Sequence, residues 1–311
     1  MTLRLPDKWI WDFWLAIDGP DYHAFYLQAP RSLGDPDLRH RNATVGHAVS
    51  TDLRTWTVLP DALHPGRSGS WDDVATWTGS IISHNNLWYL FYTGTSHSEE
   101  GRIQRIGLAT STDLVTWDKH GNDPLMQADD RWYETIGDSE WPEEAWRDPW
   151  VFEADSTFHA LITARANHGP SDGRGVIGHA TSNDLLNWNV QPALSQPGEF
   201  AHLEVAQMVT VDDTHLLVFS CDRARISEQR LTRLGTGRDA TYSLPTSHLL
   251  GPYDIEQATE ALPAGLYSGR LSPTQDDAWV WLAFRDESDT GGFVGELSDP
   301  IPYPWSNRMT Q

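Results

Sequence analysis

Short apolar runs separated by polar turns recur along the whole chain, and they predict β-strands rather than helices. Turn sequences such as Asp18-Gly19-Pro20 and Asn85-Asn86 have the composition that hairpins prefer. Five copies of one arrangement, each a short strand, a polar turn and an apolar strand, lie at residues 12–27, 77–93, 147–164, 204–220 and 269–285. The first residues of successive copies are 57 to 70 positions apart. This pattern predicts five β-hairpins.

A second repeat has three close copies, at residues 46–56, 107–117 and 178–188, with the shared pattern G-x-A-x-S-x-D-L-x-x-W. Self-similarity at a roughly fixed period is the signature of repeat architectures. We interpret each copy as a strand, a Ser/Asp turn and a buried tryptophan. The aspartate recurs with the repeat, so we expect its three copies to be turn residues: Asp52, Asp113 and Asp184.

Five β-meanders in one chain predict a five-bladed β-propeller, because blades around a central channel leave only short and protected sheet edges. A β-sandwich is the alternative architecture, but it accounts for the strands and not for the repeat. The Gly- and charge-rich stretches 167–174 and 223–238 are flanked by strands of the same repeat, so neither is a linker. We therefore expect an all-β fold with a single domain over residues 1–311.

Composition narrows the possible partners. The chain has 22 basic and 44 acidic residues, a net charge of -22, which disfavours nucleic acid and anionic membranes as partners. Cys221 is the single cysteine, so an intrachain disulfide is impossible, and no Cys/His spacing resembles a zinc site. We expect neither a metal nor another cofactor. The sequence has no long apolar run and no signal-like segment, which favours a cytoplasmic location, with secretion of a processed form as the alternative.

Acidic residues recur at the heads of the predicted hairpins. The first strand of each blade faces the central channel, so residues at equivalent positions of different blades converge in space. Aligning the hairpins places Asp12, Asp148 and Glu204 at three heads, so we expect these acids to meet at one mouth of the channel. The other two heads and the residue before Asp148 add aromatic, hydroxyl and basic groups: Trp77, Thr78, Tyr267 and Arg147.

Paired carboxylates in this setting are typical of glycoside hydrolysis, with a spacing of about 5–5.5 Å in retaining enzymes and roughly 6.5–9.5 Å in inverting ones. Asp12 lies within an aromatic run and Glu204 within an apolar strand. A buried acid without a partner is costly, which favours a functional reason for both. Crowded acids repel each other, so one of them should have a raised pKa. We expect Glu204 to be that acid.

The ordered set of motifs resembles glycoside hydrolase families 32 and 68, the β-fructosidases and fructosyltransferases that share a five-bladed propeller. Residues 11–14, Trp-Asp-Phe-Trp, resemble the levansucrase-type W-D-S-W segment, and residues 77–80 resemble W-S-G-S. Residues 147–149 match R-D-P, and residues 292–300 resemble the end of the fructosyltransferase fold. The chain departs from the family pattern after Glu204, where Val-Ala replaces the family's Cys-Pro or Arg-Pro.

The resemblance implies a role for each of these residues. Asp12 would be the nucleophile, Asp148 would stabilise the transition state, and Glu204 would be the acid/base. Levansucrase-like enzymes have another acid two residues before the acid/base, and here that position is His202, which shares a strand face with Glu204. The residues expected to bind substrate are Trp11, Gln28, Trp77, Thr78, Arg147, His202 and Tyr267.

The implied activity is retaining hydrolysis of terminal fructosyl residues from sucrose, fructo-oligosaccharides or fructans, with transfer to sugar acceptors as a second outcome. The partner would be a small fructoside. Propellers of the arabinanase/xylosidase type have the same five blades and three acids, but the Trp-Asp opening and Arg-Asp-Pro favour fructosides. A non-catalytic glycan-binding propeller would keep the 16 tryptophans but would not need three acids at equivalent positions.

Overall fold

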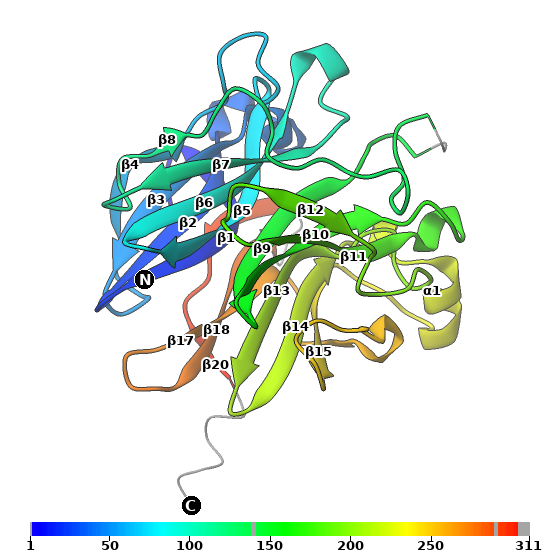
Figure 1. The fold of residues 1–311 in the computed structure, drawn as a ribbon. Helices are drawn as coiled ribbons and strands as arrows, with labels where there is room; N and C mark the ends of the chain where they lie inside the picture. The colour runs from blue at the N-terminus through cyan, green and yellow to red at the C-terminus, as the bar shows by residue number, and fades with distance from the viewer. Residues whose placement is uncertain (1, 138–140, 289–291, 304–311) are drawn as a thin grey trace, which may run out of the picture.

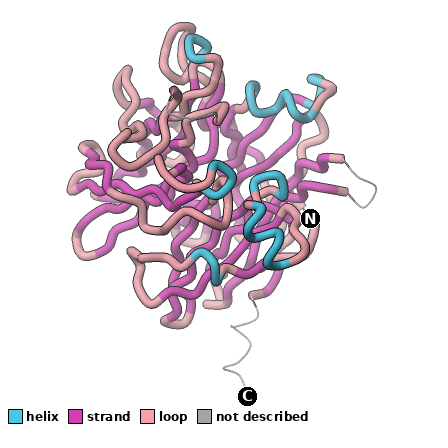
Figure 2. The backbone as a smooth tube through the Cα atoms, turned by 90° about the vertical axis from the view of Figure 1, so that its right-hand side faces the viewer, coloured by secondary structure: helices cyan, strands magenta, loops and turns pink. Residues whose placement is uncertain are grey.

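Five four-stranded sheets make up the chain in a computed structural model that describes residues 2–137, 141–288 and 292–303. Figure 1 shows these sheets following one another around a centre in chain order, as the blades of a propeller. The short helices lie in the loops between strands, as Figure 2 shows. The prediction of an all-β five-bladed propeller is therefore confirmed. None of the helices in the described ranges is long and apolar enough to span a membrane.

Each blade is a meander in which consecutive strands pair antiparallel. The strands of the first three blades are β1 (Lys8–Asp18), β2 (Asp21–Pro30), β3 (Thr44–Ser50) and β4 (Thr57–Leu63); β5 (Ala75–His84), β6 (Leu87–Thr95), β7 (Arg105–Ser111) and β8 (Asp118–Lys119); and β9 (Trp146–Ala154), β10 (Thr157–Arg165), β11 (Gly175–Ser182) and β12 (Trp188–Gln191).

The fourth blade closes like the others, whereas in the fifth the last strand pairs with β18 rather than with β19. Their strands are β13 (Glu204–Val211), β14 (Thr214–Cys221), β15 (Ala240–Thr246) and β16 (Thr259–Glu260); and β17 (Leu266–Pro273), β18 (Trp279–Glu287), β19 (Phe293–Leu297) and β20 (Ile301–Pro302). The helices are η1 (Arg31–Leu33), η2 (Pro36–Asn42), η3 (His97–Glu99), η4 (Ser171–Gly173), η5 (Arg223–Arg225), α1 (Glu228–Leu234) and η6 (Ile255–Gln257).

The first strands of the blades, β1, β5, β9, β13 and β17, contact one another in a closed ring around the channel. Polar side chains tie this ring together across blades. Gln207 on β13 both donates to the carbonyl of Leu271 on β17 and accepts from its amide. Arg270 on β17 donates to the carbonyl of Ala206. These bonds between inner strands help to hold the mouth of the channel in one arrangement.

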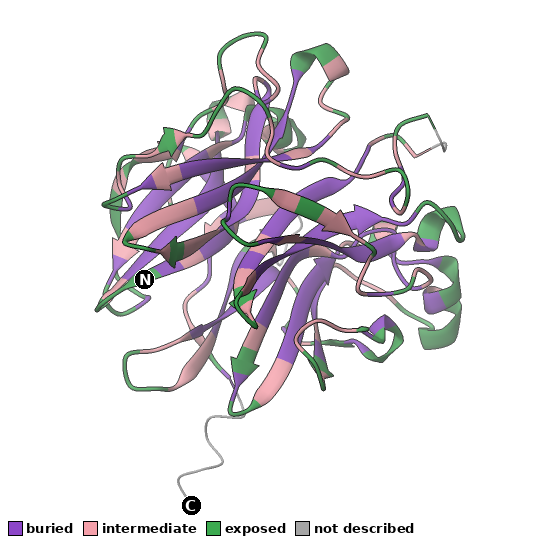
Figure 3. Cartoon of the chain, in the orientation of Figure 1, coloured by how far each residue is buried: buried purple, intermediate pink, exposed green. Residues whose placement is uncertain are grey.

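The apolar core lies between adjacent blades, where the facing surfaces of two sheets pack. One cluster joins Phe91 and Leu108 of the second blade to Trp146 and Ile162 of the third. The inner strands are mostly buried and the turns mostly exposed, as the purple and green segments of Figure 3 show. Trp11, Trp14 and Trp146 are among the largest fully buried side chains, so part of the high tryptophan content fills the core.

The G-x-A-x-S-x-D-L-x-x-W repeat forms the third strand of a blade and the turn after it. In the first copy, Asp52 accepts from the Ser50 hydroxyl and from the amides of Arg54 and Thr55. Equivalent bonds recur at Asp113 and Asp184. The prediction that these aspartates are turn residues is confirmed. The tryptophan of the repeat is only half-buried, and the fully buried apolar residue of the turn is instead the leucine that follows the aspartate.

Candidate active site

Every inner strand contains a β-bulge at the same point, where two of its residues oppose one residue of the next strand. The residues at the bulge are Asp12, Thr78, Asp148, Val205 and Ser268. Four of them have positive φ angles: 31° at Asp12, 55° at Asp148, 53° at Val205 and 48° at Ser268. Positive φ is uncommon for a residue with a Cβ, and a bulge changes the direction of its side chain. Asp12 and Asp148 therefore enter the channel mouth from equivalent positions.

Glu204 lies one residue before the bulge of its blade. Its pairing with Ser220 is the last regular step before the register shifts, and Val205 occupies the bulge position. The prediction that Glu204 and Asp148 occupy equivalent positions is therefore wrong by one residue. Glu204 instead shares its position with the residues that precede the bulge in the other blades: Trp11, Trp77, Arg147 and Tyr267.

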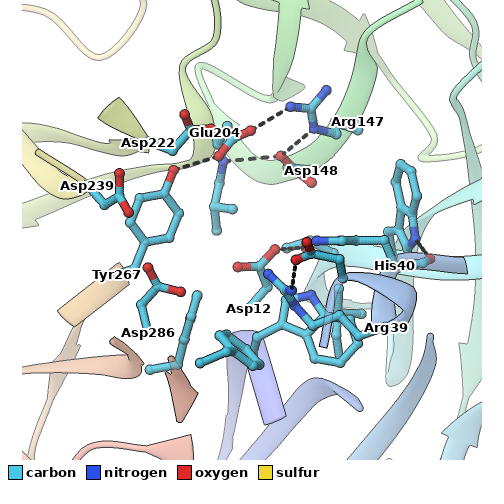
Figure 4. Close-up of a pocket in the computed structure, with 18 of the residues that line it drawn as sticks. Asp12, Arg39, His40, Arg147, Asp148, Glu204, Asp222, Asp239, Tyr267 and Asp286 are labelled. Atoms are coloured by element: carbon cyan, nitrogen blue, oxygen red, sulfur yellow. Dashed lines mark hydrogen bonds and ion pairs between the residues drawn. The ribbon is translucent and has the colours of Figure 1, made fainter. Parts of the chain in front are cut away.

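The three acids nevertheless line one pocket of about 630 Å³ at the channel mouth. Figure 4 shows the carboxyl groups of Asp12, Asp148 and Glu204 directed into this space from three different blades. The predicted substrate-binding residues that also line the pocket are Trp11, Trp77, Thr78, Arg147 and Tyr267. The structure thus brings these eight residues together.

Hydrogen bonds from two neighbouring bulges hold the Asp12 carboxylate. The Ser268 hydroxyl donates to Oδ1 at 2.6 Å, and the Thr78 hydroxyl donates to Oδ2 at 2.9 Å. Burial raises the pKa of Asp12, the two hydroxyls oppose that rise, and the nearby charge of Glu204 adds to it. Both oxygens are therefore oriented by residues that occupy the same position in adjacent blades, which fixes the plane of the carboxylate.

Asp148 is the most deeply buried of the three acids, with 3 % of its surface exposed. Its Oδ2 accepts from the Thr163 hydroxyl at 2.9 Å and from the amide of Val205 at 3.3 Å, and lies 3.4 Å from Nε of Arg147. Burial raises the pKa of Asp148 to about 7, and the negative charges of Asp12 and Glu204 contribute to the rise against the opposing charge of Arg147. Asp148 is therefore about half protonated at neutral pH and mostly protonated below it.

Glu204 has two strong donors. Nη2 of Arg147 donates to Oε1 at 2.7 Å, and the hydroxyl of Tyr267 donates to Oε2 at 2.6 Å. Burial alone would raise the pKa of Glu204, but the charge of Arg147 and the Tyr267 hydroxyl hold it well below its ordinary value. The prediction of a raised pKa for Glu204 is therefore wrong: the pKa values of Asp12 and Asp148 are the ones that are raised.

His202 lies beneath the pocket wall and is not among its lining residues. Nδ1 of His202 is 2.8 Å from Nη2 of Arg147 and 3.0 Å from Nη1 of Arg225. A guanidinium can only donate, so Nδ1 accepts both bonds and the proton of the neutral ring is on Nε2. Burial and the charge of Arg147 lower the pKa of His202 to about 4. His202 therefore positions two arginines by accepting their hydrogen bonds. The geometry does not support the expectation that His202 contacts substrate.

Gln28 also lies outside the pocket lining. It is 1 % exposed, and its Nε2 donates to the hydroxyl of Thr44 on the neighbouring strand β3. The prediction that Gln28 contacts substrate therefore disagrees with the geometry, because the side chain lies between two strands of the first blade. In contrast, Trp77 lies on the pocket wall, where its Nε1 donates to the carbonyl of His40.

Several pocket residues were not anticipated from the sequence. They come from the segments at or after the end of the second strand of a blade: Arg39, His40, Asp222, Arg225, Asp239, Asp286 and Phe293. The first and second strands of a blade run in opposite directions, so the end of the second lies beside the beginning of the first. Charged residues directly after an apolar second strand, such as Asp222 after β14, were the signal that could have identified them.

Three carboxylates from three blades at one mouth of a propeller form a site of the kind that glycosidases use. The family of the chain follows from a comparison with known families, because residues 14–270 match the family described as "Glycosyl hydrolases family 32 N-terminal domain". The chain therefore belongs to glycosyl hydrolase family 32. Asp148 and Glu204 lie inside the matched range, and Asp12 lies two residues before it.

Relatives of known name agree with this family. A bifunctional 6(G)-fructosyltransferase/2,1-fructan:2,1-fructan 1-fructosyltransferase of Allium cepa is 32% identical over 161 residues, covering 46% of this chain and 22% of that protein. A probable sucrose-6-phosphate hydrolase of Psychromonas ingrahamii is 32% identical over 133 residues, covering 37% of this chain and 23% of that protein. The matches thus span about a quarter of the length of these relatives.

Among solved structures, inulosucrase from Halalkalicoccus jeotgali bound to kestose superposes with a TM-score of 0.75. The alignment covers 94% of this chain and 80% of that one, at 23% sequence identity. At this identity the similarity shows that the two chains share the five-bladed fold.

Proposed function

We propose that this protein is a retaining β-fructofuranosidase that releases terminal fructosyl residues from sucrose, fructo-oligosaccharides or fructans, and that it transfers part of the fructose to sugar acceptors. Membership of family 32 favours fructosides over the substrates of the arabinanase/xylosidase type, and favours catalysis over simple glycan binding. The observation that carries the proposal is that Asp12, Asp148 and Glu204 line one pocket, with Arg147 bound to two of them.

Asp12 is suited to be the nucleophile. Two hydroxyls hold its carboxylate in one plane while leaving it on the pocket wall. Its attack on the anomeric carbon would form a fructosyl ester as the bond to the leaving sugar breaks. A group held in its reactive orientation before the substrate arrives loses little entropy on reaching the transition state.

Glu204 is suited to be the acid/base. It would protonate the departing oxygen in the first step and deprotonate the incoming water or sugar hydroxyl in the second. The two displacements together retain the anomeric configuration of the substrate. Before substrate binds, Glu204 is ionised and the proton of the cluster is on Asp148. The acids interact strongly, so they titrate as a coupled set. As substrate binds, the proton would move from Asp148 to Glu204, which leaves Asp148 charged and Glu204 able to protonate the departing oxygen.

Asp148 and Arg147 complete the proposed site. As substrate binds, Asp148 would accept hydrogen bonds from fructosyl hydroxyls and stabilise the positive charge that develops on the ring. Arg147 holds the Glu204 and Asp148 side chains at 2.7 Å and 3.4 Å, and is itself held by His202 and by Oε1 of Gln104. Arg147 would therefore be a positioning residue as well as a wall of the pocket.

The test of this proposal is incubation of the full chain with sucrose, inulin and levan, followed by chromatographic analysis of the products. Release of free fructose, with fructosylated oligosaccharides appearing at high sucrose, is the expected result. An aryl α-arabinofuranoside serves as the comparison substrate. Cleavage of that compound with no release of fructose would overturn the proposal in favour of the arabinanase/xylosidase type.

A further inference from the structure

The pocket is strongly acidic beyond the three acids used for catalysis. Among the described residues that line it, nine are acidic and only three are arginines. The six additional acids are Asp37, Glu143, Asp222, Asp239, Asp286 and Glu287. A pocket that binds an anionic ligand presents the opposite balance, because phosphate recognition depends on cationic or amide donors directed at the phosphate oxygens.

The arginines of the pocket are already engaged. Arg147 is bound to Glu204, Asp148 and Gln104. Arg225 donates to His202 and lies 4.0 Å from Glu143. Arg39 is mostly buried over the rings of Trp11 and Phe293, donates to the carbonyl of Pro36 and lies 3.6 Å from Asp37. Each of these three guanidiniums therefore has a carboxylate beside it that a dianion would have to approach.

Three of the six additional acids gather on the side of the pocket where the leaving sugar would lie. In Figure 4, Asp222, Asp239 and Asp286 surround Tyr267 next to Glu204, the proposed acid/base. Burial raises the pKa values of Asp222 and Asp286 to about 6; the charges of Glu204 and Asp239 add to the rise at Asp222, and those of Asp239 and Asp12 add to the rise at Asp286. Each carboxylate on this side therefore already experiences repulsion from its neighbours.

An adjoining hollow of about 220 Å³ between the fourth and fifth blades has the same character. It is lined by Arg223 and Arg238, but Asp239, Asp286 and Glu287 line it as well. Arg238 is paired with Glu260 at 2.5 Å. Arg238 is therefore already engaged, and the three acids outnumber the two arginines of this hollow.

We infer that the leaving-group side of this pocket selects uncharged sugars and excludes phosphorylated ones, so that sucrose is a substrate and sucrose 6-phosphate is not. This inference rests on the proposed function and decides between the two kinds of substrate that the names of the relatives suggest. Sucrose 6-phosphate carries its phosphate on the glucosyl part, which is the leaving group. A phosphate monoester has a charge of about -1.5 to -2 at pH 7, and placing it among like charges rejects it.

The charge-based exclusion makes a prediction that a steric exclusion does not. The Debye length falls from about 10 Å at 0.1 M salt to about 3 Å at 1 M, so added salt screens the partly exposed acids from the phosphate. We expect kcat/KM to favour sucrose over sucrose 6-phosphate by at least ~100-fold at low salt, and this ratio to shrink at least ~5-fold at about 1 M NaCl. Exclusion by shape alone would give a ratio independent of salt, which would overturn the inference.

Charge removal on the leaving-group side gives the second arm. The double variant Asp239→Asn/Asp286→Asn should raise the efficiency on sucrose 6-phosphate relative to sucrose at least ~10-fold. Asp130→Asn is the matched control, because it removes an exposed acid from a loop away from this pocket and should leave the ratio unchanged. Equal ratios in both variants would overturn the inference.

Binding separates this inference from the proposed activity. Trp11 and Trp77 line the pocket, so tryptophan fluorescence can report titration with sucrose and with sucrose 6-phosphate without any turnover. Selective binding of sucrose with no cleavage would support the inference and contradict the proposed function. Comparable binding of both sugars, tighter binding of the phosphorylated one, or no binding of sucrose would overturn the inference.

Discussion

Arg147 donates from Nη2 to Oε1 of Glu204 over 2.7 Å, which joins the inner strands of the third and fourth blades by a buried ion pair. The two residues occupy the position just before the bulge in their respective blades. They are adjacent in space because the inner strands of neighbouring blades contact each other. The low pKa of Glu204 and the orientation of its carboxylate both follow from this pairing.

Replacing Glu204 by glutamine tests its role as acid/base. The amide oxygen of the substituted side chain can still accept from Arg147, so the fold should be retained, but the proton transfer is lost. We expect the Glu204→Gln variant to lose at least ~10³-fold in turnover on sucrose, or about 4 kcal/mol of barrier. Steady-state kinetics with a thermal melt measures both effects.

The matched control is Glu143→Gln, which removes another pocket acid, 3.5 Å from the same arginine. Its loss should be below ~10-fold, since Glu143 has no proposed part in proton transfer. If Glu143→Gln were as damaging as the change at Glu204, the acid/base assignment would have to be abandoned.

The coupled acids predict the pH dependence of activity. The last proton of the set leaves near pH 7, where Asp148 has its pKa, and catalysis needs that proton. We therefore expect kcat/KM to fall as pH rises through about 7. The Thr163 hydroxyl lowers the pKa of Asp148 by donating to its charged form. Thr163→Val should thus shift this basic limb to higher pH, whereas a shift to lower pH would contradict the assignment.

The propeller was predictable from the sequence because its repeat is local. Each hairpin and each G-x-A-x-S-x-D-L-x-x-W turn is specified by residues close in the chain, and five copies leave few other architectures. The acids were found for the same reason, since Asp12, Asp148 and Glu204 lie at the heads of the predicted hairpins.

The one-residue offset of Glu204 was not predictable in this way. It results from a bulge that requires positive φ at Val205, a conformation that neither valine nor its neighbours indicate. This offset places Glu204 beside Arg147 and Tyr267 and leaves the bulge positions to Asp12 and Asp148. The pKa expectation was wrong for the same reason, because the sign of each shift depends on how closely the acid is paired with the arginine.

Two buried histidine pairs predict how stability depends on pH. Nδ1 of His159 lies 3.0 Å from Nε2 of His179, and His23 and His47 form the same pair in the first blade at 2.9 Å. Burial lowers the pKa of His179 to about 4 and that of His47 to about 3. The unfolded chain binds these protons at about pH 6.5. The contribution of the neutral histidine pairs to the free energy of unfolding is therefore complete above about pH 6.5, and it is lost as pH falls toward 4.

The second blade supplies a variant that removes one pair. It has Tyr89 and Leu108 at the positions of His159 and His179. Between about pH 7 and pH 4.5 the free energy of unfolding falls. In the double variant His159→Tyr/His179→Leu this fall should be smaller by about 3 kcal/mol, the value of a shift of roughly two pKa units. Urea unfolding at several pH values measures this difference. Identical slopes for the variant and the parent would show that the pair does not contribute to the pH dependence.

The nucleophile can be identified by trapping. If Asp12 forms the fructosyl ester, the reaction proceeds by two displacements, and NMR should show that the first product retains the anomeric configuration. Hydrolysis and transfer both pass through this ester, so Asp12→Asn should abolish both together. Asp148→Asn should also be severely impaired, but through loss of transition-state stabilisation.

A mechanism-based fructosyl label, located by peptide mass analysis, should therefore be found on Asp12, and it should still form slowly on Asp12 in the Asp148→Asn variant. Ser268→Ala provides a graded control, because it removes one of the two hydroxyls that orient the carboxylate and should slow labelling without moving the label. A label on Asp148, or inversion in the first product, would refute the assignment even if both carboxamide variants were inactive.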